Sequence, residues 1–308
     1  MLGKEPYLIT NLSELLDLAK QGEPQRLVVI AAEDHEVLDA VIQATHLGMI
    51  EPILVGDQHR IRQLIEELGD DPSNYTILPA DDLESSAVVG LELFKNGRAD
   101  YIMKGLIDTS ILLKHVLNKE YGLRQEGLLS HVMLYQFERY HKLIGLSDGG
   151  MNIAPDLAQK KQITDNAIEV FRSLGYDDIN IGFLTAKEKP SDKMPATIDA
   201  KALRAMRWPK GVETAGPIAL DLCLDKQAAE VKQYDSPVAG EVDLLIVPTI
   251  EVGNALGKSI TYVGGGESAG IIMGARVPIV LVSRADSAET KLYSIALGKM
   301  ISQYEHKE

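Results

Sequence analysis

The sequence predicts a protein of two α/β lobes with a ligand-binding cleft between them, and three observations predict it. The chain has 308 residues, more than one hydrophobic core usually serves. Apolar runs rich in β-branched residues alternate with helical patterns through the first third, as in βαβ units with a parallel sheet. Aromatic residues are only 5%, so the core must be mainly aliphatic, which is typical of parallel sheets buried under helices.

In the first third, each predicted strand is followed by a helical pattern, so we expect neighbouring strands to run parallel. The predicted strands are Arg26–Ala32, Pro52–Val55, Tyr75–Leu78 and Tyr101–Lys104, and the helices that follow them are Asp34–Gly48, Ile61–Leu68, Ser86–Lys95 and Thr109–Lys119.

The middle third begins with two apolar runs, Leu128–Gln136 and Lys142–Leu146, which are close enough in sequence to pair without an intervening helix. A helix is predicted at Pro155–Leu174, and a strand at Ile179–Leu184. The segment Ala186–Thr197 is rich in Lys, Pro, Ser and Asp and is predicted to be a mobile loop.

The last third is predicted to contain a strand at Asp243–Val247 that leads into a loop at Pro248–Asn254. The glycine-rich segment Ile260–Gly274 is expected to be partly helical. A final strand, Val277–Val282, precedes a final helix at about Ser287–Gln303.

Composition limits the class of protein. The net charge of −14 argues against a general nucleic-acid binder, although local cations can still hold an anionic ligand. Cys223 is the one cysteine, so no intrachain disulfide can form and a reducing interior is expected. The N-terminus lacks a signal-peptide core and no long apolar run would span a membrane, so we expect a cytoplasmic protein.

The segment Val277–Glu289 predicts an anion site. A buried strand ends in a loop carrying Ser283 and Arg284, and a helix then opens, capped by Asp286 and Glu289. The first N–H groups of a helix lack intrahelical partners and the helix dipole favours negative charge there. Because ligands of open α/β sheets bind at the carboxyl ends of strands, this loop is a candidate phosphate site.

Several such blocks occur in order along the chain, and together they resemble the phosphate acetyltransferase and phosphate butyryltransferase family, most closely its butyryltransferase branch. The blocks are Lys104-Gly105, Ser147–Asp156, Lys193–Thr197, Gly216–Asp221, Ser236–Gly240, Pro248–Asn254 and Ser283–Ser287.

The resemblance implies a fold like that of isocitrate and isopropylmalate dehydrogenases. It implies a first lobe of residues 1–130 plus 275–308, and a second lobe of residues 131–274 that supplies contacts to other subunits of a homodimer or larger homo-oligomer. It also implies that the protein moves an acyl group between coenzyme A and inorganic phosphate through a ternary complex, with acyl-CoA and phosphate as its binding partners.

The resemblance also implies roles for the Ser-Arg pair. The Ser283 hydroxyl would bond the reacting carbonyl, where a negative oxygen develops. The alternative is a turn or cap residue. The Arg284 guanidinium would hold phosphate oxygens with its planar fork, and the alternative is a surface salt bridge of little consequence.

The family pattern breaks at the general base. In the acetyltransferase branch a proposed catalytic aspartate follows the Ser-Arg pair at a fixed distance, where this chain has Thr290. Glu289 is the candidate base and Asp286 a candidate substrate contact, although together they also match a capping box. The thiol could also lose its proton without a dedicated carboxylate. Tyr262 stands near the place of an arginine in that branch, and we expect it to contact substrate.

Other candidate substrate contacts are weaker. Gly253 permits close backbone approach and Asn254 can bond a carbonyl or phosphate, but a tight turn explains both equally well. Lys104 ends a predicted strand, and Thr109 and Ser110 begin a helix, so all three could meet phosphate. Helix capping is the alternative for the two hydroxyls, and is slightly favoured.

The sequence contains no cluster of Cys and His with metal-ligand spacing, so no metal site is predicted. It also lacks a Walker loop and a G-x-G-x-x-G motif after the first strand, so ATP and NAD are not expected. No tightly bound cofactor is therefore predicted, and coenzyme A enters as substrate or product.

The sequence thus favours an acyltransferase that takes a short acyl chain, with butyryl preferred. Phosphate acetyltransferase is the alternative within the same chemistry. A catalytically weak relative that binds coenzyme A or phosphate for regulation is the alternative of another class, because the base position is replaced.

Overall fold

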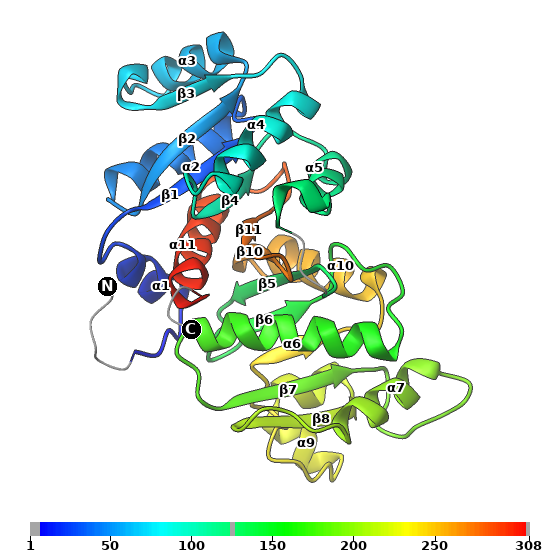
Figure 1. Ribbon diagram of the computed structural model, residues 1–308. Coiled ribbons are helices and arrows are strands. Elements are labelled where there is room, and N and C mark those ends of the chain that lie inside the picture. Colours follow the sequence, from blue (N-terminus) through cyan, green and yellow to red (C-terminus); the bar gives the residue numbers. More distant parts are fainter. Residues whose placement is uncertain (1–6, 124–126, 306–308) are drawn as a thin grey trace. The chain divides into compact units, whose positions relative to one another are not determined.

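A computed structural model describes residues 7–123 and 127–305 of the chain (Figure 1). These residues form two compact units. Unit 1 comprises Ser13–Gly127 and Ala269–Glu308, and unit 2 comprises Pro6–Leu12 and Leu128–Ser268, in each case for the described residues. The chain therefore leaves unit 1 after its first third and returns to it for the last strand and helix.

Unit 1 contains a sheet of order β3-β2-β1-β4-β11-β10, parallel except for the antiparallel pair β11 and β10. The residues Leu27 to Ile30 of β1 are fully buried, as expected for an interior strand covered on both faces. The alternation predicted for the first third is confirmed. The strands are β1 (Gln25–Ile30), β2 (Ile50–Gly56), β3 (Thr76–Pro79), β4 (Tyr101–Lys104), β11 (Ile279–Val280) and β10 (Glu267–Met273), most of which lies in unit 1.

Three helices of unit 1, α2, α3 and α4, begin at aspartate caps. Asp34, Asp57 and Asp82 each accept a hydrogen bond from a backbone N–H in the first turn of the next helix, which satisfies donors that would otherwise be unpaired. The helices are α1 (Leu12–Ala19), which lies almost wholly in this unit, α2 (His35–His46), α3 (Gln58–Glu67), α4 (Leu83–Lys95), α5 (Thr109–Val116) and α11 (Ala288–Glu305), with short 3₁₀ turns at Pro72–Asn74 and Lys119–Tyr121.

Unit 2 contains strands in the order β5-β6-β9-β7-β8. Its first two strands pair antiparallel, which confirms that the two apolar runs of the middle third join directly, and the other pairs are parallel. The strands are β5 (Ser130–Gln136), β6 (Ile144–Ser147), β7 (Ile179–Leu184), β8 (Val212–Ile218) and β9 (Leu244–Ile246), and the helices are α6 (Leu157–Ser173), α7 (Pro195–Arg204), α8 (Leu220–Leu224), α9 (Lys226–Val231), α10 (Ile250–Lys258) and a π-helical turn (Ser259–Val263).

The last third departs from its prediction in three places. The segment Ile260–Gly274 is helical only to Val263, and the chain turns at Gly265, whose φ is +64°, before it enters β10. The predicted strand Val277–Val282 shrinks to β11, because Pro278 has no N–H to donate to a ladder. The predicted loop Pro248–Asn254 is mostly helix, since α10 begins at Ile250.

Other elements were not predicted. Helix α7 begins at Pro195, inside the segment predicted as a loop, because proline is well tolerated in the first turn of a helix. Strand β8 was not predicted because Gly216-Pro217 interrupts its apolar pattern near the end. Helices α8 and α9 are only short turns, below the length at which helical periodicity can be recognised.

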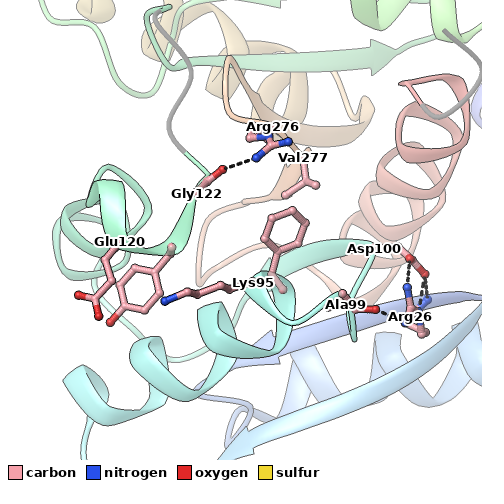
Figure 2. Close-up of a pocket in the computed structure, with 11 residues that line it drawn as sticks. Arg26, Lys95, Ala99, Asp100, Glu120, Gly122, Arg276 and Val277 are labelled. Atoms are coloured by element: carbon pink, nitrogen blue, oxygen red, sulfur yellow. Dashed lines mark hydrogen bonds and ion pairs between the residues drawn. The ribbon is translucent and has the colours of Figure 1, made fainter.

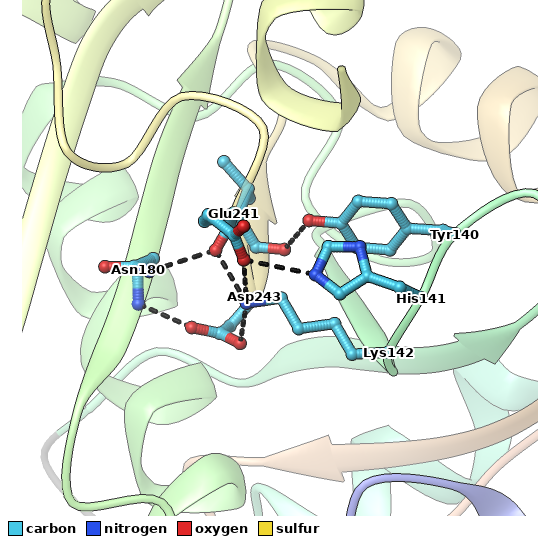
Figure 3. Close-up of polar contacts among 7 residues, drawn as sticks. Tyr140, His141, Lys142, Asn180, Glu241 and Asp243 are labelled. Atoms are coloured by element: carbon cyan, nitrogen blue, oxygen red, sulfur yellow. Dashed lines mark hydrogen bonds and ion pairs between the residues drawn. The ribbon is translucent and has the colours of Figure 1, made fainter. Parts of the chain in front are cut away.

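A polar cluster holds together the amino ends of three strands of unit 2 (Figure 3). Lys142 Nζ lies 2.9 Å from Asp243 Oδ1, and the same carboxylate accepts the backbone N–H of Asn180 at 2.7 Å. Burial raises the pKa of the Asp243 carboxyl, while the bonds from Asn180 and Lys142 oppose that effect. Tyr140 donates to the carbonyl of Val242 at 2.7 Å. The cluster is structural because its donors and acceptors are used within it.

No helix within residues 7–123 and 127–305 is both long enough and apolar enough to cross a membrane.

Candidate active site

The loops after β4 and β11 lie side by side in unit 1. The two strands are parallel, with Met103 opposite Val280. Lys104 and the segment Ser283–Ser287 therefore leave the sheet at the same edge, its carboxyl edge, where ligands of α/β sheets bind. This sheet edge brings together most of the predicted residues of the first lobe.

A tight turn presents Ser283. Its backbone N–H donates to Asp286 Oδ2 at 2.8 Å, and its carbonyl accepts the backbone N–H of Asp286 at 3.1 Å. Its hydroxyl accepts the N–H of Ala285 only at 3.4 Å, and the residue is exposed. Asp286 thus shapes the turn, and the Ser283 hydroxyl has capacity to bond another molecule.

The predicted cap of α11 is wrong. Thr290 donates its backbone N–H to Ser287 Oγ at 3.2 Å, and the two hydroxyls lie 3.4 Å apart. Ser287 is therefore the capping residue, and the carboxylate of the predicted Asp286 instead accepts the backbone N–H of Ser283. Glu289 is exposed on the first turn of the helix and takes no part in a capping box.

The amino end of α11 is also less open than predicted. The N–H of Ala288 donates to Glu36 Oε2 at 3.1 Å, and that of Thr290 is used by Ser287. Two of the first three amide donors of the helix are therefore occupied, one of them by a carboxylate. An anion at this edge would depend on side-chain cations more than on the helix end.

Three such cations gather there. Arg284 Nη2 lies 2.7 Å from Asp108 Oδ1, and both side chains are more than half exposed. Such an exposed ion pair is weak, so another anion can easily replace Asp108 as the partner of Arg284. Lys104 is half-buried and its Nζ donates to the carbonyl of Gly105 at 3.3 Å. Burial lowers the pKa of the Lys104 ammonium, and the nearby Arg284 and Lys291 cations lower it further. A phosphate would relieve this mutual repulsion.

Lys291 is the residue that the sequence interpretation missed. It is buried on α11 with 2% exposure, and its Nζ donates to the backbone carbonyl of Asp286. It therefore connects the helix to the Ser283 turn. Its signal was a lysine among the apolar residues of an amphipathic helix, directly after Thr290, where a charged side chain would ordinarily face solvent.

Thr109 and Ser110 occupy the first two positions of α5, and neither hydroxyl caps the helix. The N-terminal cap residue is Asp108, which makes no side-chain capping bond. The capping alternative for the two hydroxyls is therefore wrong. Ser110 is exposed and Thr109 partly so, next to the partner of Arg284.

The remaining predicted residues belong to unit 2. Gly253 lies in α10, where a Cβ would come within 2.6 Å of Gly149 Cα, so glycine permits the close approach of two backbones. Asn254 Nδ2 is 3.4 Å from the carbonyl of Gly149. Tyr262 is 65% exposed, with Lys258 Nζ 5.9 Å from the centre of its ring.

Asp148 is the centre of the glycine-rich turn after β6. Its carboxylate accepts the N–H groups of Gly150 at 2.8 Å and Met151 at 2.9 Å, and that of His131 at 3.1 Å. Asn152 Nδ2 donates to it at 2.6 Å. These bonds give Asp148 a structural role, as turn-making residues usually have. Among the described residues, no group of His, Cys, Asp and Glu is arranged to hold a metal ion.

Comparison with known proteins identifies the family of this chain. Residues 78–298 match the family model described as phosphate acetyl/butaryl transferase. The phosphate butyryltransferase of Clostridium acetobutylicum is 36% identical over 96% of this chain and 99% of its own. The phosphate acetyltransferase of Thermotoga maritima is also 36% identical, over 94% of this chain and 99% of its own.

Solved structures agree. A branched-chain phosphotransacylase from Enterococcus faecalis V583 has a TM-score of 0.80 at 32% identity, covering 90% of this chain and 99% of that chain. A 4-hydroxythreonine-4-phosphate dehydrogenase from Burkholderia phymatum has a TM-score of 0.51 at 12% identity, covering 91% of this chain and 99% of that one, and shares the fold alone. The predicted dehydrogenase-like α/β fold is thus confirmed. The chain belongs to the phosphate acetyl/butyryl transferase family, and it is a phosphate acyltransferase.

Proposed function

We propose that this enzyme transfers a short acyl group, butyryl in preference to acetyl, between coenzyme A and inorganic phosphate, with Ser283, Arg284 and Lys104 at the reacting centre. The observation that carries the proposal is the meeting of an exposed serine hydroxyl with cations at one sheet edge of unit 1. Butyryl is preferred because Thr290 and Tyr262 replace the two residues that the acetyltransferase branch has at these places.

Each group has a defined task. Arg284 releases Asp108 and holds the phosphate with its fork, while Lys104 neutralises a second phosphate oxygen. A phosphate oxygen then attacks the thioester carbon. The carbonyl oxygen becomes negative, and the Ser283 hydroxyl donates to it. The tetrahedral adduct then collapses to the acyl phosphate as the C–S bond breaks, and coenzyme A leaves as a thiolate. The phosphate gives up its proton to water and the thiolate takes one from water, so no net proton is gained or lost.

No dedicated carboxylate is needed in this scheme. In the direction of acyl-CoA formation the thiol loses its proton to water, since Thr290 cannot act as a base and is engaged in the cap of α11. Glu289 is exposed to solvent, and the proposal gives it no part in proton transfer. Positioning of both substrates and stabilisation of the oxyanion then provide most of the rate enhancement.

Three further elements belong to the proposal. The enzyme acts as a homodimer or larger assembly, as the resemblance implies. It requires no tightly bound cofactor, because coenzyme A is itself a substrate. It works in the cytoplasm, in keeping with a buried free thiol at Cys223 and the reducing interior that its lone cysteine suggests.

The test is release of free coenzyme A from purified protein supplied with butyryl-CoA or acetyl-CoA, with and without phosphate. The proposal expects phosphate-dependent release with a higher kcat/KM for butyryl-CoA. A higher value for acetyl-CoA would identify a phosphate acetyltransferase, and tight CoA binding without turnover would point to a regulatory relative. Absence of phosphate-dependent release from either thioester would refute the proposal.

A further inference from the structure

Unit 1 has a cavity at the opposite end of its strands from Ser283 (Figure 2). Arg26 lies near the start of β1, Ala99 and Asp100 come directly before β4, and Val277 lies just before β11. These strands are parallel, so the cavity faces the amino edge of the sheet. Its volume is about 550 Å³, within the range of sites for small molecules.

One wall of the cavity is formed by an ion pair of Arg26 and Asp100, whose charges cancel. Arg26 Nη2 lies 2.5 Å from Asp100 Oδ1, and its Nε lies 3.1 Å from Oδ2 of the same carboxylate. The remaining nitrogen of Arg26, Nη1, donates to the carbonyl of Gly97 at 2.6 Å. Each nitrogen of this guanidinium makes a bond within the chain, and the bond to Asp100 raises the pKa of Arg26, so most of its charge is already compensated at the cavity wall.

Two other cations keep free donors. Arg276 makes a single bond from Nη1, to the carbonyl of Gly122 at 3.2 Å, and is otherwise exposed. Lys95 is exposed and forms no ion pair with any part of the chain that the structure describes. Figure 2 shows Lys95 and Glu120 at the left and the Arg26–Asp100 pair at the right. Arg276 lies at the top of the same view. Three cations face two carboxylates here, although the chain as a whole carries a net charge of −14.

The rest of the lining is apolar. Phe94 is partly exposed, and Ala99, Tyr121 and Val277 are buried at the cavity wall. A free ion such as chloride would leave this surface in contact with water. The lining instead suits a molecule that joins an anionic head to an apolar body, because both parts of the surface would then be used.

We propose that this cavity binds a small organic anion, a carboxylate or a phosphate monoester with an apolar body about the size of an aromatic ring, through Arg276 and Lys95. The site is separate from the candidate acyl-phosphate site, because strands β4 and β11 run between them. It does not depend on the proposed function, since neither Ser283 nor Lys104 lines it.

Calorimetry with three probes tests the proposal: benzoate, phenyl phosphate and the neutral benzyl alcohol. All titrations use the full chain with Arg284→Gln, so that binding at the other sheet edge is suppressed. Saturable binding of benzoate or phenyl phosphate is expected, with none of benzyl alcohol. Adding Arg276→Gln or Lys95→Gln should weaken it about tenfold or more, the scale of one charge-assisted hydrogen bond. Both side chains are exposed, so these variants should remain folded.

Arg98→Gln is the matched control. Arg98 is exposed on the same α4–β4 connection and does not line the cavity, so its removal should leave binding unchanged. Benzoate binding alone would identify a carboxylate site, and phenyl phosphate binding alone a phosphate monoester site. The proposal is overturned if neither anion binds at millimolar concentration, if benzyl alcohol binds equally well, or if the Arg276 and Lys95 variants bind as tightly as Arg98→Gln.

Discussion

Replacing Lys291 with methionine should impair turnover more than folding. Lys291 Nζ donates to the backbone carbonyl of Asp286, whose carboxylate in turn accepts the N–H of Ser283 at 2.8 Å. Methionine keeps most of the buried stem and removes only the ammonium. The turn that presents the Ser283 hydroxyl then loses the side-chain bond that ties it to α11.

The magnitude follows from that single bond. A hydrogen bond that involves a charged group contributes about 1.5–3 kcal/mol. If its loss is expressed in the positioning of Ser283, kcat/KM falls by about 10- to 100-fold, since 1.4 kcal/mol corresponds to tenfold. The ammonium also repels Lys104, so its removal should raise the pKa of that lysine. Stability should change little, because an ammonium with one carbonyl partner is costly to bury.

The assay is steady-state release of coenzyme A from butyryl-CoA at varied phosphate, with the unfolding midpoint measured in parallel. Lys299→Met is the matched control, because Lys299 is also buried on α11, and its Nζ donates to the carbonyl of Gln21 at 3.4 Å. Lys299→Met should leave kcat/KM within about twofold of the parent value. Equal losses in the two variants, or none in Lys291→Met, would refute the positioning role.

Three further substitutions test the cations and the base. Arg284→Gln should raise the KM for phosphate about tenfold with an unchanged unfolding midpoint, since its exposed pair with Asp108 contributes little to stability; an unchanged KM would contradict the phosphate role. Glu289→Gln should leave the pH dependence of kcat unaltered, and loss of one limb of that profile would restore Glu289 as the base. Lys104→Met should weaken phosphate binding yet stabilise the fold at neutral pH. Folding lowers the pKa of Lys104 below its ordinary value of 10.5, so between the folded pKa and that value the unfolded chain holds more protons and stability rises with pH. Urea unfolding at several alkaline pH values should show that this rise is reduced in Lys104→Met. A variant that is less stable than the parent at neutral pH would contradict the reasoning.

The sequence predicted the βαβ part of unit 1 well, because long apolar strands and amphipathic helices carry clear periodicities. It failed where the pattern is short or interrupted. Strand β10 follows a glycine run that looked like the end of a loosened helix, and β8 is interrupted by a Gly-Pro pair. Such elements are specified by their neighbours in the sheet more than by their own residues.

The candidate site shows a similar division. Ser283, Arg284 and Lys104 could be chosen from sequence because they follow strands, and parallel pairing brings those strand ends together. The local contacts of these residues could not be predicted from the sequence. Asp286 bonds the turn rather than the helix, and the partner of Lys291 is a backbone carbonyl that has no sequence signal.

The central claim is that this sheet edge carries out acyl transfer with the Ser283 hydroxyl at the developing oxyanion. The most direct test is the phosphate-dependent turnover of butyryl-CoA by Ser283→Ala. The account predicts a fall in kcat of about 100-fold or more, the scale of losing one oxyanion donor, with little change in the unfolding midpoint because the hydroxyl has only a weak internal bond. A folded Ser283→Ala protein with full kcat would contradict the account.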